Sequence, residues 1–139
     1  MVDQNCAYCM EGELVAKFGI KICELETSKV YLFKEQSHPG RCIVAHKKHV
    51  GDMNELTAEE RAAYFEDVAR VARAIMKAFN PDKVNYGAYG DTGHHLHVHL
   101  CPKYKDEYEW GGVFLMNPDK KYLTDAEYTE MIEKIKANL

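Results

Sequence analysis

The sequence predicts an α+β fold over residues 1–139, in which a single domain holds a mainly antiparallel sheet of about five strands, one long central helix and a C-terminal helix. Three observations predict it. Short β-rich runs fill the first third of the chain, a long amphipathic helix follows, and two further strands come before a last helix. The length is sufficient for one sizeable core, and the sequence contains no internal repeat and no low-complexity segment.

The first three strands are predicted from runs of β-branched and aromatic residues that are separated by turn residues. We expect strands at 18–25 and 29–34, joined as a hairpin through 26–28. A third strand is expected at 41–46, after the turn residues of 37–40.

The long helix begins at a capping box, in which Thr57 is followed three residues later by Glu60. Apolar residues then recur at helical spacing and define the face toward the core. They are Phe65, Val68, Ala72, Ile75 and Phe79. Asp67 falls outside this stripe, and Asn80-Pro81 ends the helix.

The second half of the chain predicts two strands and a second helix. We expect strands at 83–89 and 94–103, joined by a tight turn at 90–93, and then a polar and aromatic loop at 105–121. Thr124 and Glu127 form a second capping box, which begins the C-terminal helix.

Three histidines alternate with aliphatic residues in the strand predicted at 94–103. Side chains alternate between the two faces of a strand, so His95, His97 and His99 share one face while the residues between them enter the core. Successive imidazoles then lie roughly 6.6 Å apart, twice the strand rise, which suits one small anion such as a phosphate. Imidazole acts as nucleophile, proton carrier or metal ligand near neutral pH, so the row predicts a reaction site.

The composition argues against several classes of protein. A net charge of −4 gives no support for a general nucleic-acid binder, so a local cluster that includes Arg41 and Lys103 would have to attract a phosphate. The chain has no apolar run long enough to span a membrane and no signal-peptide core. Five cysteines, an odd number, do not favour a disulfide framework, and we expect a cytoplasmic, reduced protein. Cys23, Cys42 and Cys101 are predicted to be small buried hydrophobes.

A second group of reactive residues lies near the N-terminus, where Cys6 and Cys9 are separated by two residues. Two thiolates at this spacing supply one edge of a tetrahedral zinc site, which needs two further ligands. A redox role requires a thioredoxin-like βαβ context, and no strand precedes this segment. Plain unligated thiols are the remaining alternative.

The histidine row and its surroundings resemble the histidine triad family of nucleotide hydrolases and transferases. The motif is His95-Leu96-His97-Val98-His99-Leu100, followed by Cys101-Pro102-Lys103. The resemblance extends over about residues 6 to 114 and includes the segments 40–44, 47–50, 85–87, 90–93 and 110–111. It implies the fold of that family, a nucleotide as ligand and a homodimer.

The resemblance also implies roles for individual residues. His97 would be the nucleophile toward phosphorus, and His99 would bind the phosphoryl oxygens and help to carry a proton. Thr92 stands where the family often has a hydroxyl that serves the phosphate or the leaving group. Asn85 matches an asparagine near the nucleotide phosphates, and Glu35 lies roughly where an acidic residue holds the ribose.

The chemistry is consistent with these roles. An unprotonated ring nitrogen attacks phosphorus when the other ring nitrogen is fixed as a donor to a carbonyl oxygen. Displacement then gives a nucleotidyl-imidazole, which water opens in a second step. Flanking imidazoles and a hydroxyl donate to the phosphate oxygens, where charge accumulates.

Three residues depart from the family's usual pattern. Asp91, a candidate substrate-binding residue, replaces an Asn or Gln, and its charge beside a phosphate is unfavourable unless it is protonated or turned away. His94 replaces an apolar residue or proline, and Lys103 replaces an arginine. The segment 90–95 is most similar to the branch that cleaves dinucleoside polyphosphates such as diadenosine tetraphosphate, because the phosphoramidate branch typically has a longer turn.

The resemblance implies a structural zinc as the cofactor. In the zinc-containing members, His49 and His95 would join Cys6 and Cys9 as ligands. Four protein ligands leave no open position for water, so no catalytic metal is expected.

Other functions remain open at this point. Within the same chemistry, the protein would be a phosphoramidate hydrolase, or a nucleotidyl transferase or phosphorylase in which phosphate replaces water. A metalloenzyme of the cupin type would bind a catalytic metal through the histidine row, although no histidine follows His99. A third class is a non-catalytic nucleotide-binding module.

Overall fold

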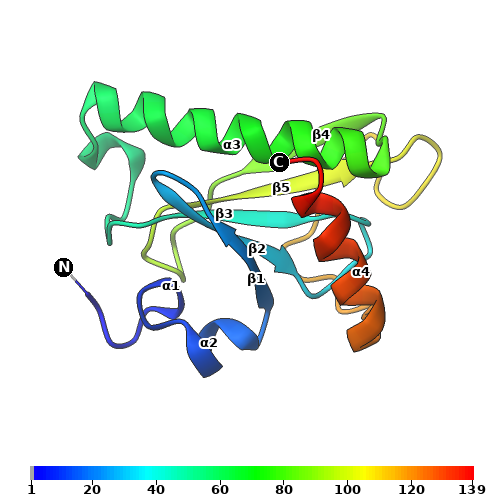
Figure 1. Ribbon diagram of the computed structural model, residues 1–139, viewed down its shortest axis with the longest axis horizontal. Helices are drawn as coiled ribbons and strands as arrows, with labels where there is room; N and C mark the ends of the chain where they lie inside the picture. The colour runs from blue at the N-terminus through cyan, green and yellow to red at the C-terminus, as the bar shows by residue number, and fades with distance from the viewer. Residues whose placement is uncertain (1) are drawn as a thin grey trace.

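The computed structural model describes residues 2–139, in which five antiparallel strands form one sheet (Figure 1). Their order across the sheet is β1-β2-β3-β5-β4. The strands are β1 (Gly19–Glu24), β2 (Ser28–Phe33), β3 (Cys42–His46), β4 (Lys83–Gly87) and β5 (His97–Lys103). The predicted α+β class is confirmed, and each strand lies within the range that the sequence predicts or extends one residue beyond it.

Two long helices were predicted from capping boxes, and both begin where those boxes stand. They are α3 (Ala58–Phe79) and α4 (Asp125–Lys136). Thr57 and Thr124 each accept a hydrogen bond from the backbone N–H three residues later, and the Glu side chain at that position accepts one from the backbone N–H of the threonine. Asn80, in the left-handed conformation with φ 49°, ends α3 as predicted.

The N-terminal segment contains two short helices that the sequence did not predict, α1 (Ala7–Met10) and α2 (Gly12–Ala16), and a 3-10 turn at Met53–Glu55 precedes α3. Neither α1 nor α2 has a side-chain cap. Their order comes from tertiary contacts, because Glu11 between them accepts from Tyr31 Oη and pairs with Lys21 and Lys29.

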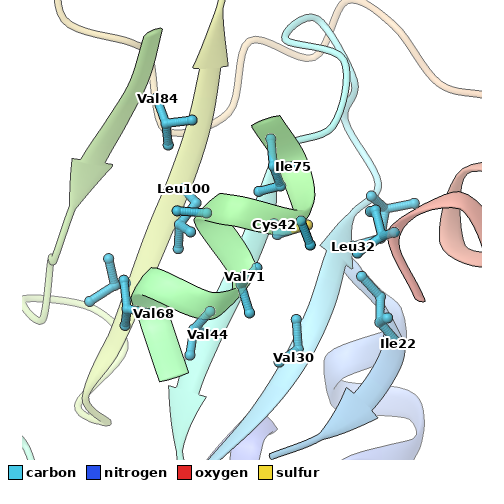
Figure 2. Packing of buried hydrophobic residues seen from close by; sticks show 14 of the residues in the cluster. Ile22, Val30, Leu32, Cys42, Val44, Val68, Val71, Ile75, Val84 and Leu100 are labelled. Atoms are coloured by element: carbon cyan, nitrogen blue, oxygen red, sulfur yellow. The ribbon is translucent and has the colours of Figure 1, made fainter. Parts of the chain in front are cut away.

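The core lies between α3 and one face of the sheet (Figure 2). Alternate residues of the central strands point toward the helix, among them Val30, Val44 and Leu100, and meet Val71 and Ile75 of α3. The other face carries a smaller apolar cluster that includes Tyr31 and Ile43 and packs against the N-terminal segment. Every residue of β3 and β5 is therefore buried.

Two positions of α3 differ from the predicted stripe. Phe65 was assigned to the core face, yet its side chain is 41% exposed, and the buried aromatic residue is its neighbour Tyr64. Asp67 was placed outside the stripe but is buried. Its Oδ2 accepts hydrogen bonds from Thr27 N, Thr27 Oγ1 and Ser28 Oγ at 2.7–2.9 Å, so the carboxylate fixes the β1–β2 turn to the helix.

Replacing Asp67 is expected to destabilise the fold. Asp67→Ala leaves three donors at the hairpin turn without their acceptor, which costs about 2 to 3 kcal/mol of unfolding free energy. Urea unfolding measures this loss. The matched control is Glu66→Ala, which removes an exposed ion pair with Arg73 and should cost less than about 0.5 kcal/mol. Equal losses in the two variants contradict the assignment.

No helix among the described residues combines the length and apolar character that crossing a membrane requires.

Candidate active site

The histidine row faces away from α3, on the face of the sheet that the N-terminal segment covers. The predicted strand at 94–103 begins only at His97, so His95 precedes the ladder rather than standing on it. Leu96 N–H instead donates to the carbonyl oxygen of Val50 in the preceding loop, and the carbonyl oxygen of Leu96 accepts from His46 N–H. His95, His97 and His99 nevertheless line one cavity, so the three imidazoles share a face as predicted.

This cavity has a volume of about 810 Å³ and lies in front of β5. It is lined by apolar side chains and by the loop between β4 and β5. The apolar side chains include Phe18, Phe33 and Ile43, and the loop contributes Tyr89, Asp91, Thr92, Gly93 and His94. A volume in this range fits a ligand of drug or nucleotide size.

His97 is oriented by the backbone of its own strand. Its Nδ1 lies 2.6 Å from the carbonyl oxygen of His95, to which it donates, so Nε2 keeps the lone pair. Burial lowers the pKa of His97, which keeps the ring neutral and its lone pair free at neutral pH. The backbone of Gly93 also lies close to this ring, because a methyl group at Gly93 would be 3.6 Å from Cε1.

His95 is oriented in the opposite sense. Its Nε2 donates to the carbonyl oxygen of His46 at 2.6 Å, which leaves Nδ1 as the free acceptor. Burial lowers the pKa of His95 to about 4. The Nδ1 lone pair points at Cys6 Sγ, 3.3 Å away, rather than into the row.

Four potential metal ligands converge at this end of the row, namely Cys6, Cys9, His49 and His95. Their ligand atoms all lie within 4.8 Å of one another. Neighbouring pairs are 3.1 to 3.6 Å apart. Bonds of about 2.0–2.3 Å to a tetrahedral zinc give ligand–ligand edges of roughly 3.3–3.8 Å. The two thiols and two imidazoles therefore fit a metal, and the carbonyl of His46 already orients one imidazole as metal sites require.

The structure brings some of the predicted substrate residues to the cavity and not others. Thr92 and Asp91 are exposed on its rim, and Glu35 is buried in its wall. The Glu35 carboxylate accepts from Ser37 N and Oγ and from the backbone N–H groups of 120 and 121, so it fixes the loop after β2. Asn85 is opposite Cys101 in the β4–β5 ladder and is not among the described residues that line the cavity.

Arg41 was predicted as part of a local positive cluster, but it is completely buried behind His99. Its Nη2 donates to His99 Nδ1 at 3.1 Å. Lys103, assigned to the same cluster, is also buried and donates to the carbonyl oxygens of Glu109 and Gly112. Of the predicted buried thiols, Cys42 and Cys101 are buried and Cys23 is partly exposed.

Sequence reasoning missed two aromatic residues at the site. Tyr8, between the two cysteines, has its ring 5.3 Å from that of His95 and 5.0 Å from that of His97. Phe114, within the predicted loop, is buried and its ring lies 6.5 Å from that of His99. The position of Tyr8 could have been predicted from the cysteine motif. Tyr8 lies between Cys6 and Cys9, so a metal that binds both cysteines and His95 also places the tyrosine beside the histidines. Nothing in the sequence around Phe114 indicated its place.

Comparison with known proteins agrees with this geometry. The family model described as HIT domain matches residues 19–106 of the chain. The chain belongs to the HIT domain family. Among solved structures of this family, a histidine triad protein from Sinorhizobium meliloti superposes with a TM-score of 0.84 at 24% identity, covering 92% of this chain and 95% of that one. A zinc-bound histidine triad family protein from Mycobacterium smegmatis superposes with a TM-score of 0.67 at 20% identity, covering 96% and 91%.

Relatives of this HIT protein in sequence carry several names. The protein hit of Bacillus subtilis is 28% identical over 123 residues, 84% of this chain and 83% of the relative. The adenosine 5′-monophosphoramidase of Schizosaccharomyces pombe is 27% identical over 141 residues, 95% of this chain and 99% of the relative. The bis(5′-adenosyl)-triphosphatase of Dictyostelium discoideum is 28% identical over 98 residues, 67% of this chain and 65% of the relative.

Proposed function

We propose that this HIT protein hydrolyses phosphate bonds of nucleotides through a covalent intermediate on His97. The observation that carries the proposal is the hydrogen bond from His97 Nδ1 to the carbonyl oxygen of His95, at 2.6 Å. It leaves the Nε2 lone pair on a ring that lines a nucleotide-sized cavity. The names of the two relatives that act on adenosine phosphoramidate and on a dinucleoside triphosphate support the same class of reaction.

The reaction proceeds in two displacements. In the first, the Nε2 lone pair of His97 forms a bond to phosphorus, and the bond from phosphorus to the leaving group breaks with its electron pair going to that group. In the second, a water oxygen attacks phosphorus, the P–N bond breaks, and the electron pair returns to Nε2 while the water proton passes to solvent. Donors held beside the phosphorus stabilise the charge that accumulates on its oxygens.

Further residues of the chain act on the substrate in this proposal. His99 donates an N–H to a phosphoryl oxygen, and the Thr92 hydroxyl serves the phosphate or the leaving group. Asp91 and Glu35 contact the nucleotide at the rim and the wall of the cavity, where Glu35 Oε1 accepts one hydrogen bond, from Ser37 N. Asn85, on β4, acts near the phosphates in this proposal.

We propose dinucleoside polyphosphates as the preferred substrates. The cavity of about 810 Å³ is near the upper end of the volumes found for small-molecule sites, which favours a substrate with a large leaving group such as a second nucleotide. The short segment between Asn85 and His95 favours the same branch. Nucleoside phosphoramidates are the second candidate, favoured by the relative whose match covers 95% of this chain.

A direct competition between diadenosine tetraphosphate and adenosine phosphoramidate tests the assignment. We expect the higher kcat/KM with the dinucleotide, because binding of its second nucleoside adds contacts that the phosphoramidate lacks. Products are separated by liquid chromatography, with inorganic phosphate added in one arm to detect phosphorolysis. The opposite ranking assigns the protein to the phosphoramidate branch, and no turnover of either leaves a binding module.

We further propose that the metal of the Cys6, Cys9, His49 and His95 cluster is a structural zinc. Two thiolates and two imidazoles are the ligands that zinc prefers, and four protein ligands leave no position for a reacting water. When bound, zinc would hold the N-terminal segment against the loop before β5. His95 would then be held from both sides of its ring, by the metal at Nδ1 and by the carbonyl of His46 at Nε2.

We also propose that the protein is a homodimer and that it has no nucleic acid as partner. We propose the cytoplasm as its compartment, because five free cysteines stay reduced there. Strand β4 is an edge of the sheet, and exposed apolar side chains lie on it and on α3. They are Tyr86, which is 56% exposed, and Phe65 and Met76, each 41% exposed. Sedimentation should give twice the 16.0 kDa chain mass, and Tyr86→Lys should shift it to the monomer.

A further inference from the structure

Arg41 is a buried cation at the back of the active site. Its side chain is 0% exposed, and none of the ion pairs among residues 2–139 involves it. Nη1 donates to Leu115 O at 3.1 Å, and Nη2 donates to Met116 O at 2.9 Å, to His99 Nδ1 at 3.1 Å and more weakly to Met116 Sδ. A buried charge without a counterion is costly, so its retention calls for a functional reason.

The two carboxylates whose charges act on Arg41, those of Glu35 and Glu109, make their hydrogen bonds to other residues. The carboxylate of Glu35 accepts four hydrogen bonds from residues 37, 120 and 121. The carboxylate of Glu109 binds His38 and the backbone of Leu115. The positive charge of Arg41 is therefore not neutralised by a direct partner and acts on the anion that binds in the cavity.

Aromatic rings fix the plane of this guanidinium. The Cζ atom of Arg41 lies 4.1 Å from the centroid of Phe33 and 4.9 Å from that of Phe114. Both rings belong to the wall of the cavity. Cation–π contacts of this kind suit a planar guanidinium, which a lysine ammonium would not reproduce.

The contact with His99 decides which ring nitrogen of the histidine carries the proton. A guanidinium only donates hydrogen bonds, so His99 Nδ1 must accept. The proton of the neutral ring is therefore on Nε2. This is the opposite tautomer to that of His97, whose Nδ1 carries the proton. The two neighbouring rings thus offer a lone pair and an N–H donor, which are the two groups that attack on phosphorus requires.

We propose that Arg41 is a positioning residue that holds His99 as the neutral Nε2–H tautomer and places a fixed positive charge behind the phosphate. The inference rests on the proposed function. It departs from the role that family resemblance implies. In this proposal His99 keeps its Nε2 proton as a fixed hydrogen-bond donor to the phosphoryl oxygens and does not transfer a proton during the reaction. Burial, followed by the charge of Arg41 and by His97, lowers the pKa of His99 to about 2, which agrees with a ring that stays neutral.

The wild-type protein alone provides the first test. Long-range ¹H–¹⁵N spectra of the histidine rings distinguish Nε2–H, Nδ1–H and doubly protonated imidazole without any substrate. We expect His99 to remain the Nε2–H tautomer between about pH 5 and 8, the range in which an ordinary histidine titrates. An Nδ1–H tautomer, or titration of His99 within this range, overturns the inference even if the enzyme is active.

Variants then separate the hydrogen bond from the charge. Arg41→Met removes both, so the Nε2–H signal should give way to a mixture and kcat should fall about 10²-fold, with a smaller change in KM. Arg41→Gln keeps a neutral N–H donor, so the tautomer should be retained while kcat falls by less. Wild-type tautomer and near wild-type kcat in Arg41→Met contradict the proposal. If that variant does not fold, Arg41→Gln and the wild-type spectrum decide.

Lys103→Met is the matched control, because Lys103 is an equally buried cation that supports the same loop without contacting the histidines. It should lower the melting temperature and leave the spectrum of His99 unchanged. Loss of the Nε2–H tautomer in this control as well would assign the effect of Arg41 to loop packing and overturn its specific role. The spectra need no substrate, so an error in the substrate assignment does not alter this outcome.

Discussion

His97→Ala is expected to reduce kcat by more than about 10⁴-fold, the upper end of what acid–base assistance alone contributes. The variant removes the nitrogen that forms the covalent bond, whereas His99→Ala removes a donor and should lose less. Folding and nucleotide binding should persist, because most of the side chains that line the cavity belong to other residues. Single-turnover kinetics with an acid or alkaline quench measures both the rate and the nucleotidyl-enzyme, which should be absent from His97→Ala.

His46→Gln is the control for that experiment. His46 is likewise a buried histidine, on β3, but its ring accepts from Lys48 N and does not line the cavity. Its replacement should cost stability and leave kcat within a few-fold of wild type. Activity of His97→Ala within tenfold of wild type would exclude a covalent intermediate on this residue and leave a direct attack by water.

The sequence predicts most of the fold because its strongest signals are local. Capping boxes at Thr57 and Thr124 depend only on residues three apart, and both helices begin there. The alternation that orients His97 and His99 depends on the pleat of one strand. The face of the histidine row could therefore be predicted with no knowledge of the partners of β5.

The features that the sequence did not predict depend on contacts between distant segments. Asp67 is buried because the β1–β2 turn, 40 residues earlier, supplies its donors. Arg41 is buried because the loop at 115–116 supplies carbonyl oxygens and Phe114 supplies a ring. Helix α1 has no side-chain cap, and its position depends on the packing of Tyr8 against the histidine rings. Such positions look like ordinary surface charges or loops until the chain is folded.

Metal binding leads to the second large expected effect, on stability rather than on rate. Purified protein should contain about one zinc per chain, since four ligands converge on one position. Cys9→Ser should lower the melting temperature by roughly 10 °C, which corresponds to a loss of about 3 kcal/mol for a protein of this size. The reason is that the N-terminal segment loses its bond to the loop before β5. The value of kcat, measured well below the melting temperature, should change little.

Cys23→Ser is the matched control, since Cys23 is a partly buried cysteine of β1 outside the cluster. This variant should shift the melting temperature by only a few degrees.

A brief exposure of native enzyme to chelator should leave the initial rate nearly unchanged, because His97 and His99 carry the reaction in the proposed mechanism. A catalytic metal on the histidine row gives the reverse, with immediate loss of activity and rescue by added zinc. Metal-free protein in which Cys9→Ser is thermally neutral would instead reduce the Cys6–Cys9 pair to unligated thiols. His95 Nδ1 would then be free to bind substrate, and the tautomers of all three histidines would have to be set by the backbone carbonyls and Arg41 alone.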